Sequence, residues 1–202
     1  MTVVLFRALA VSLMVDTQTY AAPLVPPGDR SPHDLTSPHR SSPREKVLEY
    51  RFLADVTAEL YRRGVVFDVL RSDVDALGHD LVIEANGIIR HIQLKTTYCG
   101  GKSARVTSNI RLATRPSGCL IWMIYDPHTL DITAFRWFGG VPGAALPDLG
   151  TRVAKHSRGN AGGTKNERPA HRVLPRRAFV PVGNIAALVD QLFGSASSES
   201  SN

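Results

Sequence analysis

The chain has 202 residues, which suits one domain with tails and excludes two domains of full size. Apolar residues make up 43% of the sequence, enough for a hydrophobic core, and the Cys and His residues show no spacing typical of a zinc site. Lys and Arg total 24 against 18 Asp and Glu, and this net charge of +6 fits a polyanionic partner such as nucleic acid.

The first 42 residues are expected to form a disordered or non-core extension. Residues 1–15 are apolar, but the run is too short and too interrupted by Arg7 to cross a bilayer. Secretion is the less favoured interpretation, because the positive charge lies inside the apolar run and Tyr20-Ala21-Ala22-Pro23 is a poor cleavage site. Residues 16–42 are rich in Pro, Ser, Thr, His and Asp, which indicates disorder. We therefore expect a cytoplasmic protein.

The folded domain is predicted to span residues 43–194 and to begin with a helix. Ser42 is a candidate N-cap, Pro43 suits the first helical position, and Glu45 completes a capping box. Gly64 is expected to end the helix in a left-handed conformation. The apolar residues in between recur at helical spacing and form one stripe: Leu48, Phe52, Leu53, Val56 and Leu60.

Two glutamates of this helix have different expected surroundings. Glu49 falls near the middle of the apolar stripe, where a carboxylate is costly unless it is paired or bound to a metal. Glu59 lies nearer the edge of the stripe and is interpreted as a solvated or ion-paired surface residue. Glu49 is therefore a candidate site residue.

Three strands are predicted after the helix, over residues 64–70, 79–85 and 88–97, because these segments are rich in β-branched and apolar residues. Asn86-Gly87, between the second and third strands, is the strongest short signal for a two-residue hairpin turn.

Five further elements complete the prediction. They are a short helix over 107–114, strands over 119–126 and 130–138, a long loop over 139–177 and a closing helix over 185–193. This order predicts an α/β fold with a central mixed β-sheet flanked by helices. Residues 195–202 are expected to form a disordered tail. Cys99 and Cys119 fall in strand regions and are interpreted as small buried apolar residues.

The hairpin register places three polar side chains on one face of the sheet. With Asn86-Gly87 as the turn, Asp80 lies opposite Gln93, and the Cβ atoms of such cross-strand partners are about 4.5–5.5 Å apart. Lys95 follows Gln93 by two residues and therefore points to the same face. The opposite face is apolar, with Leu81, Ile83, Ile92 and Leu94.

Asp80, Gln93 and Lys95 suit metal-assisted hydrolysis of a phosphodiester bond. Mg²⁺ and Mn²⁺ take oxygen ligands, which Asp80, Gln93 and Glu49 would supply. Lys95 would orient or deprotonate an attacking water and stabilise charge on the phosphate. The alternative is an ordinary solvated sheet face. Asp73 and Asp75, in the loop before the hairpin, are further metal-ligand candidates, with turn formation as their alternative role.

The run GHDLVI (78–83) followed by IQLKTT (92–97) resembles the PD-(D/E)xK nuclease superfamily, in particular the branches with a Q-x-K third motif, such as Mrr-type restriction endonucleases and Holliday-junction-resolvase-like proteins. The resemblance covers roughly residues 44–126. It implies a restriction endonuclease-like fold, with metal-binding and catalytic roles for the residues at Asp80, Gln93 and Lys95, joined by Glu49. The third motif carries Gln93 in place of an acid, which leaves the implied metal site with less negative charge.

Residues 151–177 are strongly basic, with Glu167 as their one acid. The basic residues are Arg152, Lys155, Arg158, Lys165, Arg168, Arg172, Arg176 and Arg177, and the first six are the candidate contacts to nucleic acid. Such a segment is typical of an arm that grips phosphates without reading sequence. The alternative is a solvated surface loop.

Together these features predict a Mg²⁺- or Mn²⁺-dependent DNA endonuclease of the restriction or repair type, with a homodimer as one expectation and no membrane partner. Two alternatives remain open. One is a nucleic-acid-binding module on the same fold with weak catalysis, and the other is an adaptor whose basic loop binds an acidic protein.

Overall fold

Helix α1 (Ser41–Arg62) opens the part of the chain that the computed structural model describes, which comprises residues 41–71, 77–156, 163 and 165–195. The predicted N-cap is wrong, because Ser42 already lies inside the helix. Proline is tolerated throughout the first turn, where its missing N–H would have no helical partner, so Pro43 does not mark the first helical residue.

The predicted end of α1 is confirmed. Gly64 has a φ of 69°, and its N–H donates to the Tyr61 carbonyl at 2.9 Å. The next N–H, from Val65, donates to the Leu60 carbonyl at 3.0 Å. These two bonds form a Schellman motif, which satisfies the last carbonyls of the helix.

A six-stranded sheet, in the order β1-β2-β3-β5-β6-β9, forms the centre of the molecule. Its strands are β1 (Phe67–Arg71), β2 (Leu81–Ala85), β3 (Ile88–Tyr98), β5 (Gly118–Tyr125), β6 (Ile132–Gly139) and β9 (Val180–Val182). The β3–β5 pair is parallel and the other pairs are antiparallel, so the sheet is mixed. The predicted α/β class with a mixed sheet and helical cover is confirmed.

The β2–β3 hairpin has the predicted register. Leu81 pairs with Ile92, and Ala85 pairs with Ile88 next to the turn. Asn86 and Gly87 have φ values of 52° and 69°. Positive φ at both positions is the signature of the type I′ turn, which matches the right-handed twist of the strands it joins.

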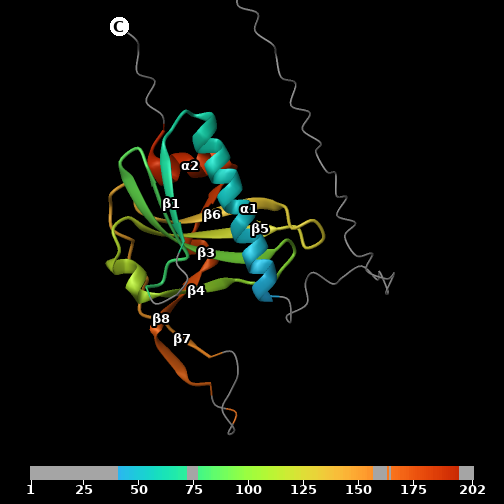
Figure 1. Ribbon diagram of the computed structural model, residues 1–202. Helices are drawn as coiled ribbons and strands as arrows, with labels where there is room; N and C mark the ends of the chain where they lie inside the picture. The colour runs from blue at the N-terminus through green and yellow to red at the C-terminus, as the bar shows by residue number, and fades with distance from the viewer. Residues whose placement is uncertain (1–40, 72–76, 157–162, 164, 196–202) are drawn as a thin grey trace, which may run out of the picture. The chain divides into compact units, whose positions relative to one another are not determined.

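Helices α1 and α2 (Ile185–Phe193) cover one face of this sheet, and Figure 1 shows α2 beside the C-terminal half of α1. The main core lies between these layers. It includes the predicted stripe of α1 and the predicted apolar face of the hairpin: Leu48, Phe52, Val56, Leu60, Leu81, Ile83 and Ile92, with Leu53 and Leu94 packed against it. Of the helices described, none is long and apolar enough to cross a membrane.

A second sheet, in the order β4-β8-β7, lies beyond the other face. Its strands are β4 (Arg105–Asn109), β7 (Val153–Lys155) and β8 (Glu167–Pro175), and two short 3₁₀ helices accompany it, η2 (Ile110–Thr114) and η3 (Arg176–Ala178). A second core joins it to the main sheet, with Leu112, Leu120, Trp122, Phe138, Leu174 and Phe179.

The second sheet corrects two predictions. The short helix predicted over 107–114 begins only at Ile110, because residues 105–109 pair with β8. The long loop predicted over 139–177 contains β7 and β8. Of the nine residues in β8 only Leu174 is buried, so the strand lacks the apolar alternation by which a strand is recognised in a sequence.

The two cysteines differ in environment. Cys119 is buried in β5 as predicted, and burial raises the pKa of its thiol to about 12. The prediction for Cys99 is wrong, because this residue is exposed just after the end of β3.

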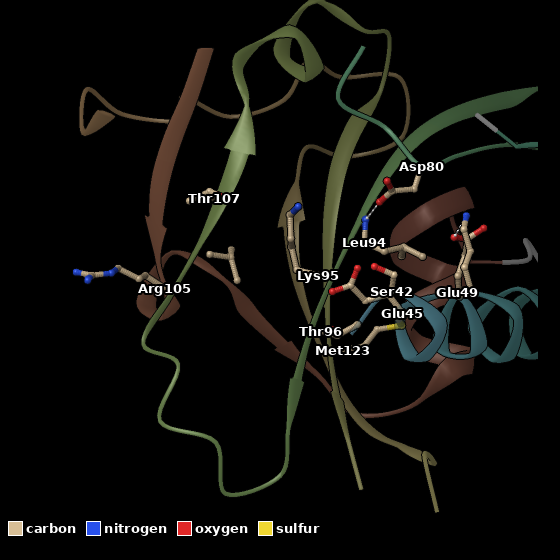
Figure 2. A pocket seen from close by; sticks show the side chains of 12 residues that line it. Ser42, Glu45, Glu49, Asp80, Leu94, Lys95, Thr96, Arg105, Thr107 and Met123 are labelled. Atoms are coloured by element: carbon tan, nitrogen blue, oxygen red, sulfur yellow. Dashed lines mark hydrogen bonds and ion pairs between the residues drawn. The ribbon is translucent and has the colours of Figure 1, made fainter. Parts of the chain in front are cut away.

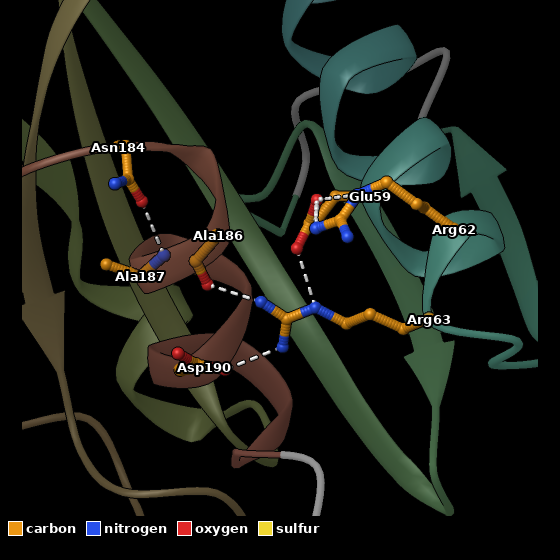
Figure 3. A network of polar contacts seen from close by, with 7 residues as sticks. All are labelled: Glu59, Arg62, Arg63, Asn184, Ala186, Ala187 and Asp190. Carbon is orange, nitrogen blue, oxygen red and sulfur yellow. Dashed lines mark hydrogen bonds and ion pairs between the residues drawn. The ribbon is translucent and has the colours of Figure 1, made fainter.

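An ion-pair network joins α1 to α2 (Figure 3). Glu59 accepts from Arg62 at 2.5 Å and from Arg63 at 2.7 Å. Arg63 also donates to the Asp190 carboxylate at 2.6 Å and to the Ala186 carbonyl at 2.9 Å. Glu59 is ion-paired as expected, but it is only 6% exposed and not a surface residue.

Replacing Glu59 by glutamine is expected to lower the melting temperature by a few degrees at neutral pH. Hydrogen bonds from Arg62 and then Arg63 hold the pKa of Glu59 below its usual value. The carboxylate therefore stabilises the fold above its unfolded pKa of about 4.3, and this contribution is lost as the pH falls through the lower folded pKa. Thermal unfolding between pH 7 and 3 should show the wild-type and Glu59→Gln curves converging in acid. A constant difference at every pH would disprove this role of the charge.

Candidate active site

Strand β3 continues beyond the point at which its antiparallel partner β2 begins, at Leu81. β2 pairs with residues 88–92, whereas β5 pairs with residues 91–98 on the other side. Among the described residues, no strand pairs with the β2 side of β3 from Gln93 onward. A cleft of about 620 Å³ opens at this edge, between the first turns of α1 and strand β4 (Figure 2).

Asp80 lines this cleft, one residue before β2. Its N–H donates to the Ile92 carbonyl at 2.8 Å, which continues the hairpin ladder by one step. Its Oδ2 accepts the Leu94 N–H at 2.7 Å, as Figure 2 shows. The carboxylate thus takes the place of a strand partner at the open edge of β3, and this contact fixes its position.

The turn before Asp80 requires glycine. Gly78 has a φ of 79°, and a Cβ atom at this position would lie 2.8 Å from the Asn109 Cβ. The chain therefore passes close against the end of β4, where a larger residue would push it away. This close approach sets where Asp80 enters the hairpin.

The structure places Lys95 in the cleft and Gln93 outside its lining. The side chain of Lys95 stands between Asp80 and β4 in Figure 2. Gln93 lies one position beyond the Leu81–Ile92 pair, opposite Asp80, as the register predicts. It is 3% exposed, and its Oε1 has no hydrogen-bond partner within the described part of the chain.

Glu49 lines the cleft from α1, and ion pairs occupy both of its carboxylate oxygens. Oε1 accepts from Arg71 at 2.6 Å and 3.1 Å, and Oε2 accepts from Lys46 at 2.9 Å. Arg71 also lies over the Tyr50 ring, 4.6 Å from its centroid. The expected cost of burying this carboxylate is therefore offset by two cations.

Glu45 also lines the cleft and was not predicted as a site residue. The sequence pattern assigned it to a capping box, but α1 begins earlier and Glu45 lies one turn before Glu49 on the same face. The i, i+4 spacing of two acids next to a hairpin carrying Asp80 and Lys95 is the signal that points to it.

Asp80 lines the cleft and could serve as a carboxylate ligand of a divalent cation, and Gln93 lies opposite it but outside the lining of the cleft. The described residues include no group of three or more His, Cys, Asp and Glu that could hold a metal by themselves. Mg²⁺ in phosphate-processing sites takes one or two protein carboxylates and completes its shell with waters and phosphate oxygens. Gln93 Oε1 is a buried amide oxygen with no hydrogen-bond partner among the described residues, and such an oxygen could serve as a neutral ligand. Asp73 and Asp75 lie outside the described residues.

The candidate nucleic-acid contacts are placed on and beside β7 and β8. Arg152, Lys155 and Lys165 are exposed, and Arg168 and Arg172 are partly buried. Two of them are held locally, since Arg168 contacts the His171 ring nitrogen at 2.8 Å and Arg172 donates to the Pro169 carbonyl at 2.7 Å. The sixth, Arg158, lies outside the described residues. Through β4, whose Arg105 lines the cleft, the same sheet reaches the candidate site.

No protein-family model matches the chain, and no curated protein sequence matches it. Among solved structures, the chain is similar to a bacterial homing endonuclease, I-Ssp6803I, with 17% identity and a TM-score of 0.28. The match covers 59% of this chain and 85% of that one. A likeness at this level supports no conclusion about function.

Proposed function

We propose that the cleft between α1, the open edge of β3 and β4 is the active site of a metal-dependent DNA endonuclease of the restriction or repair type, on a PD-(D/E)xK-like fold. One observation carries the proposal. Asp80 and Lys95 line the same open cleft, on the edge of a strand whose partner has ended, with Glu45 and Glu49 on the facing helix.

In this proposal Asp80 would hold a Mg²⁺ or Mn²⁺ ion, with Gln93 opposite it as a second oxygen ligand, and the ion would lower the pKa of a water and polarise the phosphate. Lys95 places an ammonium group where negative charge develops on the phosphate oxygens, and it orients the attacking water. Glu45, on the other wall, is placed to accept a proton from that water. The hydrogen bond from the Leu94 N–H keeps the Asp80 carboxylate in position throughout.

The second sheet would hold the DNA backbone. Residues 151–177, which include β7 and β8, contain Glu167 as their one acid. Basic residues of this kind bind DNA phosphates without regard to the base sequence. Contacts of this type set the register of the DNA, while the cleft carries the chemistry.

The wild-type protein is expected to convert supercoiled plasmid to nicked or linear DNA when Mg²⁺ or Mn²⁺ is present, and to lose this activity in EDTA. Plasmid, branched and single-stranded substrates, assayed side by side, identify the preferred DNA structure. A preparation that leaves all three intact with either metal would refute the endonuclease.

One observation favours a second candidate, a nucleic-acid-binding module with weak catalysis. Arg71 and Lys46 occupy both oxygens of Glu49, and Gln93 is neutral, so neither of these two predicted ligands adds net negative charge for a metal. A site with so little negative charge holds a divalent cation weakly. This candidate predicts salt-dependent DNA binding without cleavage.

A further inference from the structure

A smaller cavity, of about 200 Å³, lies beside the candidate active site. The chain segment that follows β3 lines it through Cys99, Gly101 and Ser103, together with Trp122 of β5 and Arg176 of η3. Trp122 is the register partner of Lys95 on the neighbouring strand, so the two side chains point to the same face of the sheet. Lys95 and the wall that Trp122 gives to the cavity therefore lie on the same face of the sheet.

One arginine lines this cavity, and a second lies on the strand next to it. Arg176 lines it, and Arg136 is the cross-strand partner of Trp122 in β6. Burial, and then the neighbouring Arg176 guanidinium, lower the pKa of Arg136. Within residues 41–71, 77–156, 163 and 165–195, neither arginine forms an ion pair. An anion bound between these two arginines would be stabilised by both guanidinium groups.

The residues that line the cavity suit a phosphate group of DNA better than a nucleobase. Trp122 is 1% exposed, and its Nε1 donates to Thr97 Oγ1 at 2.8 Å, so its ring forms part of the core and offers no stacking face. No carboxylate lines the cavity among the described residues. The Arg176 N–H donates to the Ala104 carbonyl at 2.9 Å, which fastens η3 to the segment that forms the rim.

We propose that Arg136 and Arg176 form a second phosphate-binding subsite, which holds a backbone phosphate of the DNA beyond the phosphate that is cleaved. This proposal rests on the proposed function, since the row Lys95, Trp122 and Arg136 across adjacent strands sets its geometry. Strand spacing places Arg136 about 10 Å from Lys95. Successive phosphates of one strand are separated by more than their axial rise of about 3.4 Å, so that distance corresponds to roughly one or two phosphates along the strand.

Arg176→Gln tests this subsite, with Arg177→Gln as a matched control. Both residues are exposed members of η3, but of the two only Arg176 lines the cavity. The probe is a fluorescein-labelled DNA duplex in EDTA, and its anisotropy is measured over a series of NaCl concentrations. We expect Arg176→Gln to weaken binding about tenfold. We also expect it to reduce the slope of log K against log salt by about one. Arg177→Gln should change both quantities much less.

Equal losses in the two variants would overturn the subsite, because they would reflect general attraction of the basic surface. Unchanged binding in Arg176→Gln, or a wild-type protein that does not bind the duplex, would overturn it too. The proposed function fails differently: wild-type protein that binds DNA but does not cleave it with Mg²⁺ or Mn²⁺ contradicts the endonuclease and leaves the subsite standing. Wild-type protein that cleaves DNA, together with equal binding by the two variants, would support the endonuclease and contradict the subsite.

Discussion

Replacing Lys95 by alanine is expected to lower the rate of metal-dependent plasmid cleavage by about 10³-fold, within the range measured for removing one acid–base group. Lys95 lies in the cleft with Asp80, where its ammonium faces the position proposed for the phosphate. The side chain lies outside both apolar cores, so its truncation should leave the fold unchanged. Plasmid nicking with enzyme in excess over DNA measures the effect on the chemical step.

Lys102→Ala is the matched control for Lys95→Ala. Lys102 is exposed in the segment after β3 and does not line the cleft. Its loss removes one positive charge from the protein, as the loss of Lys95 does, and we expect it to change the cleavage rate by less than about threefold, the effect of one phosphate contact at most. Similar rates for the two variants would remove Lys95 from the proposed chemistry.

Replacing Arg90 by methionine is expected to lower the free energy of unfolding by about 3–5 kcal/mol. Arg90 is fully buried in β3. Its Nε donates to the Leu192 carbonyl at 2.6 Å, and its terminal nitrogens donate to Gln191 at 2.9 Å and to Gly140 at 3.3 Å. Methionine would fill much of the space but leave these carbonyls, two of them at the end of α2, without a donor.

The guanidinium remains charged in this environment, although burial lowers its pKa. It lies 5.3 Å from the centroid of Trp137, which adds a favourable contact with the ring. Urea unfolding of wild type, Arg90→Met and the exposed-site control Arg105→Met measures the effect. Arg90→Lys should give an intermediate value, because an ammonium group reaches fewer of the carbonyls. A loss below about 1 kcal/mol in Arg90→Met would show that water or relaxation replaces these hydrogen bonds.

The hairpin could be predicted from the sequence because its determinants are local. Asn86-Gly87 adopts a turn with two positive φ values, and a two-residue turn fixes the pairing of every residue in both strands. The position of Asp80 opposite Gln93, and of Lys95 on the same face, follows from that turn alone. Whether these residues bind a metal stays a prediction.

The walls of the cleft could not be predicted, because they depend on contacts between distant segments. Arg71, 22 positions along the chain, is one of the two ion-pair partners of Glu49, and it satisfies Oε1. Glu45 lines the cleft one turn before Glu49, whereas the capping pattern assigned its side chain to the N-terminus of α1. The second sheet forms because β8 pairs with both β4 and β7. β8 lacks the alternation of apolar and polar residues from which a strand can be predicted.

The most direct test of the proposed active site compares Asp80→Asn with Glu84→Gln in plasmid nicking with Mg²⁺ or Mn²⁺. Asparagine keeps an oxygen that can accept the Leu94 N–H, so this variant removes the charge while preserving the contact that places the side chain. Glu84 is an exposed acid of β2, and its replacement removes the same charge outside the cleft. We expect no detectable nicking by Asp80→Asn and a wild-type rate for Glu84→Gln. Equal nicking rates for Asp80→Asn and the wild type would contradict the assignment of this cleft as the active site.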